Sequence, residues 1–213
     1  MSHVLIIGAS KGIGFEAVKR ALACGHSVRA MARSADRLRL SDENLEKWPG
    51  DALSSEDVRS ALEGVDTVIQ AVGIAAGPDM VLGPVRLFSK STSILIPAME
   101  EVGIRRLICV TGFGAGDSRA SIGCLQRIPF RILLERAYDD KDVQEALIRE
   151  SHLDWVIVRP GVLTNGNSTG RYKVLVDPKA WRNGLISRAD VAHFLIQQID
   201  NDAYLRKTPV LIY

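Results

Sequence analysis

The stretch VLIIGASKGIG, residues 4–14, joins a short apolar run to three glycines and is followed by the amphipathic segment FEAVKRALA. The apolar run predicts a buried strand, and the spacing of apolar residues after it predicts a helix. In such a strand–turn–helix, a first glycine permits a tight turn, a second lets the backbone approach a diphosphate, and a third allows close packing of the helix on the strand. Gly8, Gly12 and Gly14 are placed for these roles. The stretch therefore predicts a dinucleotide-binding turn, although an ordinary βα turn is the alternative interpretation.

A helix beginning near Ile13 would add a second attraction for phosphate. The N–H groups of its first turn have no partner within the helix, and the helix dipole places partial positive charge at the same end. We expect Ser10, Lys11 and Ile13 to bind the cofactor together with the three glycines.

The second expected strand ends in a basic residue. Sites for NAD usually place a carboxylate there to accept from the ribose 2′-OH, and that carboxylate would repel a 2′-phosphate. Arg33 follows the run SVRAMA instead, and a guanidinium suits a phosphate. Lys11 would add positive charge on the same side. The sequence predicts NADP(H) in preference to NAD(H), unless Arg33 is only a solvated charge at a strand end.

Short β-branched runs alternate with amphipathic stretches as far as about Arg159, which predicts a parallel sheet covered on both faces. We expect an α/β fold of one domain, residues 1–213, as a three-layer, doubly wound and mostly parallel sheet. Strands are expected at His3–Ile7, Ser27–Ala32, Leu45–Trp48, Thr67–Gln70, Arg106–Thr111, Trp155–Arg159 and Pro209–Ile212. Helices are expected at Ile13–Ala23, Ser55–Leu62, Val85–Glu101, Ile128–Glu150 and Arg188–Ile199, with capping boxes at Ser54/Asp57 and Ser187/Asp190. The stretches Gly112–Arg127 and Gly161–Gly184 are expected as long functional loops, and a small substrate-loop region is expected at about 161–186.

Composition and charge exclude several classes of protein. The chain has 213 residues, 46% of them apolar, which is enough for one sizeable core. Lys and Arg number 27 against 25 Asp and Glu, so a formal charge of +2 gives no reason to expect nucleic acid or an acidic membrane as a partner. Three cysteines without a CxxC motif are typical of reduced thiols and predict no metal site. With no leader or membrane-spanning segment visible, we expect a cytoplasmic monomer or homodimer that binds a small molecule.

Five motifs together carry a family resemblance: GASKGIG with Arg33, GDALS at 50–54, QAVG at 70–73, VTGFG at 110–114 and VRPG at 158–161. They resemble the short-chain dehydrogenase/reductase superfamily, more narrowly its atypical branch of NAD(P)-binding proteins, which includes biliverdin-IXβ/flavin reductase and NmrA-like proteins. The resemblance covers nearly the whole chain and implies a Rossmann sheet. It also implies that Asp51 contacts the adenine amino group, with Ala52 beside it, and that Ala71, Val72 and Gly73 line the adenine ribose.

The catalytic pattern of that superfamily is incomplete in this chain. Most members that reduce carbonyls carry a Tyr four residues before a Lys on one helix, where the ammonium lowers the pKa of the phenol. Here Ala137 stands four residues before Lys141. Tyr138 stands four before Asp142, whose charge would raise the pKa of a phenol. Tyr138 is therefore a candidate general acid or, alternatively, a partly buried aromatic.

Lys141 has a second expected role, because the resemblance implies that it hydrogen-bonds the nicotinamide ribose. The alternative is an i,i+4 surface pair with Glu145. Thr111 ends the fifth expected strand, at the edge where an open α/β sheet binds its ligands. Its hydroxyl could donate to a substrate oxygen or to the nicotinamide amide, or the residue could simply have been selected for β propensity.

The resemblance also places the nicotinamide against Pro160, Gly161 and Val162. Pro160 is rigid and Gly161 lets the chain pass close to a flat ring. Beyond them the long loop is basic, and three aromatic residues could offer flat faces to a planar anion, unless this is only a solvated loop. The residues concerned are Arg171, Lys173, Lys179 and Arg182, with Phe113, Tyr172 and Trp181. His26 and His193 are expected to be packing residues.

These observations predict an NADPH-dependent oxidoreductase that transfers hydride to a small planar acceptor, such as a flavin, a quinone or a tetrapyrrole. Such acceptors take hydride without one tuned side-chain acid. An NmrA-like regulator that senses NADP(H) and acts through a protein partner is the rival hypothesis, and the displaced Tyr138 supports it. A nucleotide-sugar epimerase or dehydratase is a weaker alternative, because the chain lacks an extra substrate lobe and an aligned Tyr/Lys pair.

Overall fold

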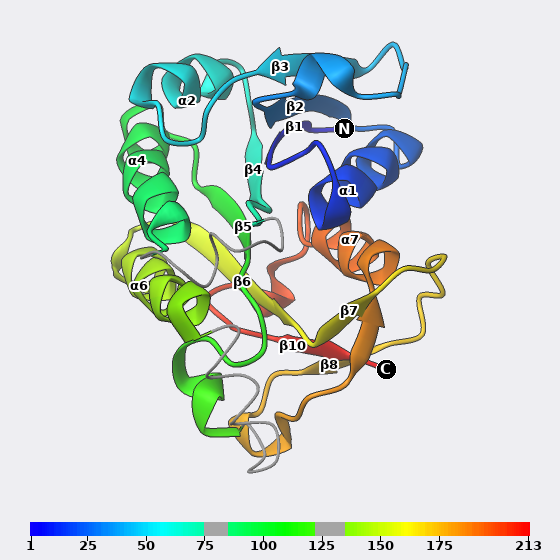
Figure 1. The fold of residues 1–213 in the computed structure, drawn as a ribbon. Coiled ribbons are helices and arrows are strands. Elements are labelled where there is room, and N and C mark those ends of the chain that lie inside the picture. Colours follow the sequence, from blue (N-terminus) through cyan, green and yellow to red (C-terminus); the bar gives the residue numbers. More distant parts are fainter. Residues whose placement is uncertain (75–84, 122–134) are drawn as a thin grey trace.

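The computed structural model describes residues 1–74, 85–121 and 135–213, and it centres on one eight-stranded sheet (Figure 1). The strands are β1 (His3–Ile7), β2 (Ser27–Ala32), β3 (Leu45–Pro49), β4 (Thr67–Gln70), β5 (Arg106–Val110), β6 (Asp154–Pro160), β8 (Lys173–Leu175) and β10 (Val210–Ile212). Their order is β3-β2-β1-β4-β5-β6-β10-β8, and every neighbouring pair is parallel except β10 with β8. The first six strands therefore have the predicted doubly wound order.

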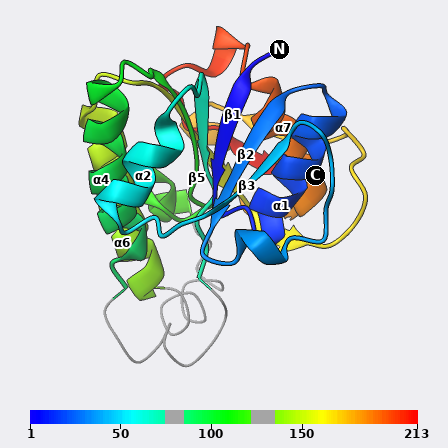
Figure 2. The same cartoon turned by 90° about the horizontal axis from the view of Figure 1, so that it is seen from above.

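Helices cover both faces of this sheet, as predicted. On one face lie α1 (Gly12–Ala23) and α7 (Arg188–Gln197), and on the other lie α2 (Ser55–Leu62), α4 (Leu87–Glu101) and α6 (Glu135–Glu150) (Figure 2). The three layers enclose two apolar cores, one on each side of the sheet. Ser54 caps α2 and Ser187 caps α7 by accepting from the N–H groups of Asp57 and Asp190, so both predicted caps are confirmed.

Strand β1 explains why a continuous apolar run is needed at the centre of the sheet. Val4 and Ile6 pack into the core beneath α1 and α7, while Leu5 and Ile7 pack into the core beneath α2 and α4. Alternate side chains of a strand point to opposite faces of the sheet. In a strand covered on both faces every side chain is therefore buried, which favours an apolar residue at each position.

The prediction of one long loop over 161–184 is wrong. This segment contains β7 (Val162–Thr164) and β8, and β7 pairs in parallel with β9 (Leu185–Ser187) as a separate two-stranded sheet. Each of these strands has three residues. A strand of that length contains too few alternations for its periodicity to be visible in the sequence, and its pairing partner is remote.

Other boundaries differ by a few residues. Strand β5 ends at Val110, one residue before the expected end at Thr111. The N–H of Thr111 still donates to the carbonyl oxygen of Val158. The stretch expected as a loop from Gly112 contains a 3-10 helix, η2, at Gly116–Ser121. Residues 122–127 of that stretch, and residues 128–134 of the helix expected from Ile128, lie outside the described residues.

Asp190 ties the start of α7 to the loop before it and to the chain terminus. Its buried carboxylate accepts from Thr169 N at 2.8 Å, from Gly170 N at 2.8 Å and from Tyr213 Oη at 2.7 Å, and also from the hydroxyls of Ser168 and Thr169. Burial disfavours the charged form, but the hydrogen bonds from Tyr213, Gly170 and Thr169 outweigh it and hold the pKa of Asp190 well below its usual value. The loop at 168–170 is therefore anchored to α7.

Asp190→Ala should lower the free energy of unfolding by about 3 kcal/mol or more, because several donors lose one shared, buried and charged acceptor. Urea denaturation would measure this, with the exposed Asp200→Ala as the control. Since the pKa of Asp190 is lowered by folding, the difference between parent and variant should be present at neutral pH and should shrink as the pH falls below about 4. Equal stabilities of the two variants would show that Asp190 is not an anchor.

Candidate functional site

The three glycines of residues 8–14 have the geometry that a close backbone approach requires. Gly8 has φ +88°, and a Cβ there would lie 2.6 Å from the carbonyl oxygen of Ala71. A Cβ on Gly14 would lie 2.2 Å from the carbonyl oxygen of Gly8, so α1 rests directly on the end of β1. Gly12 has φ +64° and no atom within 4 Å of its Cβ position, so it faces open space. The predicted ribose-lining residues Ala71, Val72 and Gly73 follow β4 at this point.

The N-terminus of α1 is free to meet an anion. Lys11 is the N-cap residue, its side chain makes no capping hydrogen bond, and the first turn contains no acidic residue. Ser10 and Ile13 flank this terminus. A hollow of about 320 Å³ opens beside it and is lined by Gly12, Glu16, Asn165, Gly166, Arg188 and Ala189. Unpaired N–H groups beside a hollow are a favourable arrangement for a phosphate.

The predicted adenosine-binding residues lie at the ends of β2 and β3. Arg33 is exposed just after β2 and makes no hydrogen bond or ion pair with the residues that the structure describes. Lys11 is likewise exposed. Asp51 is half-buried after β3, and its Oδ1 accepts from Leu53 N at 3.0 Å. Ala52 packs against the core beside it. This edge therefore offers cations near the end of β2 and an oriented carboxylate near the end of β3.

At the other end of the edge, a buried ion pair contradicts the interpretation of Glu145 as a surface residue. Arg159 is 0% exposed and Glu145 is 1% exposed. Nε of Arg159 donates to Oε1 of Glu145 at 3.0 Å, and Nη2 donates to Oε2. Asp117 accepts from the same guanidinium at 2.6 Å, and the ring of Trp181 lies 5.0 Å from it. Sequence analysis missed this group because the four segments that form it are separated along the chain.

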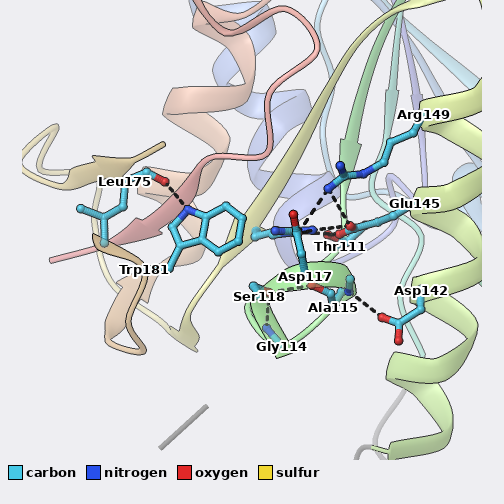
Figure 3. Close-up of polar contacts among 12 residues, drawn as sticks. Thr111, Gly114, Ala115, Asp117, Ser118, Asp142, Glu145, Arg149, Leu175 and Trp181 are labelled. Atoms are coloured by element: carbon cyan, nitrogen blue, oxygen red, sulfur yellow. Dashed lines mark hydrogen bonds and ion pairs between the residues drawn. The ribbon is translucent and has the colours of Figure 1, made fainter. Parts of the chain in front are cut away.

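The Thr111 hydroxyl is committed to the same group. Its Oγ1 donates to Oε1 of Glu145 at 2.7 Å (Figure 3). Nε and Nη2 of Arg159 donate to the two oxygens of Glu145, so this side chain is the acceptor of the Thr111 proton. A hydroxyl has one proton, so Thr111 can accept from a ligand but cannot donate to a substrate oxygen. While this hydrogen bond is intact, neither of the two donor roles considered for Thr111, towards a substrate oxygen or towards the nicotinamide amide, is available.

Lys141 projects from α6 towards the end of β5. Its Nζ donates to the carbonyl oxygen of Thr111 and lies 4.8 Å from the ring of Phe88 and 5.4 Å from the ring of Tyr138. Phe88 is held there because its N–H donates to Asp140 at 2.7 Å. Burial lowers the pKa of Lys141 to about 8. The ammonium retains two further protons with which it can bind a hydroxyl.

Tyr138 meets Lys141 in spite of its displaced register. A Cβ on Gly112 would lie 2.6 Å from the Tyr138 hydroxyl, so only a glycine lets the phenol dock at the end of β5. Burial raises the pKa of Tyr138 to about 12. The sequence-based explanation through Asp142 is wrong, because that carboxylate accepts from Gly116 N at 2.6 Å and pairs with Arg119 at 2.8 Å. A phenol with this pKa is a poor match for general acid catalysis near neutral pH.

The prediction of three exposed aromatic faces is also wrong. Phe113 and Trp181 are buried against Val210 and Ile212, and Trp181 donates to the Leu175 carbonyl oxygen (Figure 3). Tyr172 packs partly buried against α7, where its hydroxyl lies 2.8 Å from Nδ1 of His193 and its ring lies 6.2 Å from the ring of Phe194. The predicted cations Arg171, Lys173, Lys179 and Arg182 are exposed.

An exposed apolar pair lies where the aromatic faces were expected. Val162 is 52% exposed and Leu185 is 55% exposed, and the two are in register across β7 and β9. Val162 follows Pro160 and Gly161, at the end of β6. A Cβ on Gly161 would lie 2.3 Å from the carbonyl oxygen of Gly184, so a glycine is required for the two strands to approach here.

Within the described parts of the chain, no helix is long and apolar enough to cross a membrane. Over the same residues, no cluster of three His, Cys, Asp or Glu side chains could hold a metal ion. Cys24 and Cys109 are free thiols, and Cys124 lies outside the described residues.

The chain matches one family profile and is similar to two proteins in sequence and to one solved structure in fold. The profile of a family described as NAD(P)H-binding matches residues 8–202. The photosystem II assembly factor Ycf39 of Synechocystis sp. is 24% identical over 97% of this chain, and the chain spans 61% of that relative's length. The uncharacterized sugar epimerase YhfK of Bacillus subtilis is 29% identical over 82% of this chain and 77% of its own. The structure of ChuY, an anaerobillin reductase from Escherichia coli O157:H7, is 26% identical with a TM-score of 0.81, covering 99% of this chain and 97% of that one.

The lowered pKa of Lys141 gives a signed test of its burial. Between its folded value of about 8 and the ordinary value of 10.5, the unfolded chain binds a proton that the folded protein does not. The free energy of unfolding of the parent, minus that of Lys141→Met, should therefore rise with pH in this window, by at most about 1.4 kcal/mol per pH unit. Urea denaturation at a series of pH values would measure it. The free energy of unfolding of the control Lys179→Met, at an exposed lysine, should change with pH as that of the parent does. If the pH dependence of Lys141→Met also runs parallel to that of the parent, Lys141 is not buried.

Proposed function

The chain belongs to the NAD(P)H-binding family, and from that premise we propose that it is an NADPH-dependent reductase that transfers hydride to a small planar acceptor. When bound, the reduced nicotinamide supplies the hydride. The described residues supply binding, orientation and exclusion of water.

The cofactor half of the site has a proposed contact for each part of the dinucleotide. The first-turn N–H groups of α1 bind the diphosphate beside Gly12, and Arg33 binds the 2′-phosphate. Asp51 accepts from the adenine amino group. Lys141 donates to the nicotinamide ribose with the protons that the Thr111 carbonyl oxygen leaves free. Gly161, after the rigid Pro160, packs against the nicotinamide ring.

The commitment of the Thr111 hydroxyl to Glu145 is the observation that carries the choice of acceptor. Thr111 cannot donate a proton, and the pKa of Tyr138, raised to about 12, makes its phenol a weak acid at neutral pH. An unactivated ketone needs a positioned acid to protonate the developing alkoxide. Flavins, quinones and tetrapyrroles spread the added charge over a conjugated ring, so water can complete the protonation. ChuY, an anaerobillin reductase, supports the tetrapyrrole class.

The acceptor is proposed to lie on the exposed pair Val162 and Leu185, within the small substrate region at about 161–186. These side chains offer an apolar surface directly beyond Gly161, where the nicotinamide is placed. Exposed cations of the same segment, such as Arg182, could pair with carboxylates or a phosphate on the acceptor. An apolar floor with a charged rim suits a planar anion.

A catalytically weak regulator that senses NADP(H) is the second candidate function. Two observations favour it: the high pKa of Tyr138, and the similarity to Ycf39, which is named as an assembly factor. Such a protein would bind the cofactor in the same crevice but would act through a partner instead of an acceptor.

Loss of NADPH absorbance with a panel of flavins, quinones, biliverdin and simple ketones separates the two functions. We expect turnover with at least one planar acceptor and none with the ketones. Tyr138→Phe should keep its rate within about threefold of the parent, because the phenol is not the proton donor. Tight NADPH binding without turnover across the panel would favour the regulator. A loss of about 100-fold or more in Tyr138→Phe would restore the tyrosine as the acid.

The choice of NADP(H) depends on Arg33. Arg33→Ala should weaken NADPH binding by about tenfold or more, because it removes a charge-assisted contact, and should leave NADH binding nearly unchanged. Isothermal titration with each cofactor measures both affinities. Arg59→Ala, at an exposed arginine of α2 that is not among the proposed ligands, serves as the control. Equal affinities of the parent for NADPH and NADH would contradict the assignment.

A further inference from the structure

We propose that Arg188, which none of the sequence motifs singles out, is a second phosphate ligand of the cofactor site and binds the nicotinamide-side phosphate of the diphosphate from the start of α7, in the hollow that Gly12 also lines. This inference rests on the proposed function, because it assigns a further residue to the same dinucleotide. Arg188 is the first residue of α7 and lines the hollow that also contains Gly12, the open glycine at the start of α1. A ligand phosphate in that hollow would lie between backbone N–H groups and a guanidinium.

Pairing of β7 with β9 brings Asn165 and Arg188, two residues that line the hollow, next to each other. In the β7–β9 sheet, Thr164 pairs with Ser187. The next residue on each strand is Asn165 and Arg188, so these two lie side by side beyond the last paired position. Nη1 of Arg188 donates to Oδ1 of Asn165 at 2.8 Å. The guanidinium is thereby oriented by a neutral partner and keeps its other N–H groups available.

The charge of Arg188 is uncompensated within the described parts of the chain. It forms no ion pair with a described carboxylate, although arginines elsewhere in the molecule pair repeatedly with acids. Glu16 is the one acidic residue lining the hollow, and its carboxylate pairs with Lys19 at 2.8 Å. Because Glu16 already has a cationic partner on its own helix, the guanidinium of Arg188 is the charge of the lining that is left for a ligand, and its fork matches two phosphate oxygens.

The position of Arg188 in the fold selects the phosphate. Arg33, the proposed ligand of the adenosine 2′-phosphate, follows β2, which lies on the far side of β1 from β6. Arg188 follows β9, which pairs with β7 directly after Pro160 and Gly161. A dinucleotide that spans the edge from β2 to β6 therefore presents its nicotinamide-side phosphate to Arg188.

The residues around Asn165 and Arg188 are held in place before any ligand binds. Asp190, two residues after Arg188, accepts from Thr169 N and Gly170 N and so fixes the segment that continues from Asn165. Groups that are ordered before binding lose less conformational entropy when the ligand arrives. The segment at 165–170 is thus a fixed surface against which the diphosphate docks.

Two ligands and one matched variant test this proposal. NADPH contains both phosphates of the diphosphate, whereas 2′,5′-ADP keeps the adenosine 2′-phosphate and one 5′-phosphate and lacks the nicotinamide half. Arg188→Gln should weaken NADPH about tenfold or more and leave 2′,5′-ADP unchanged. Arg171→Gln, an exposed arginine of the same segment that does not line the hollow, should leave both affinities unchanged.

The outcomes separate this inference from the proposed function. Unchanged NADPH affinity in Arg188→Gln overturns the inference and leaves the reductase in place. An equal loss for both ligands also overturns it, because the effect is then not confined to the nicotinamide half. Failure of the parent to bind either NADPH or 2′,5′-ADP overturns the proposed function, and the inference with it. Unchanged 2′,5′-ADP binding in the variant also shows that its cofactor crevice is folded.

Discussion

The close approach of Gly14 to the carbonyl oxygen of Gly8 is the contact on which the cofactor crevice depends. A Cβ at position 14 would lie 2.2 Å from that oxygen, so α1 can rest on the end of β1 only while this residue has no side chain. The approach holds the uncapped N-terminus of α1 at the edge where β1, β2 and β4 end. The proposed diphosphate site there therefore depends on backbone geometry, and the proposed choice between NADP(H) and NAD(H) depends on neighbouring side chains.

The opposite half of the edge depends on a buried charge pair. Arg159 and Glu145 lose nearly all contact with water, and a pair of this kind contributes little net stability because both charges are desolvated. Its effect is positional, since it joins β6 to α6 and holds Thr111 and Asp117 at one point. The chemical consequence is that the proton of the Thr111 hydroxyl is used in a hydrogen bond within the protein. The site is therefore better suited to orienting a cofactor and an acceptor than to delivering a proton.

Both halves are held by interactions that precede ligand binding. On one side the glycine turn fixes α1, and on the other Asp190 fixes the segment around Thr169 and Gly170. The site between them is therefore expected to keep its shape when a ligand binds, instead of closing around it. Hydride transfer needs two flat groups in contact at a defined distance, and a rigid groove provides that orientation at a low entropic cost. The pair proposed as the acceptor surface, Val162 and Leu185, is exposed directly after Pro160 and Gly161 at the end of β6.

The sequence by itself determined the layered sheet, its parallel strands, the glycine turn and two helix caps, because each depends on local spacing: apolar runs buried on both faces, helical periodicity, and Ser or Asp at fixed offsets. Only the tertiary structure decided the direction in which Glu145 points, the burial of Trp181 and the placement of Arg188 and Gly12 around one hollow. An i,i+4 spacing does not say which face of α6 meets the sheet, and three-residue strands such as β7 leave no periodic signal. These contacts join segments that are far apart in the chain, so their energies depend on packing that no local pattern encodes.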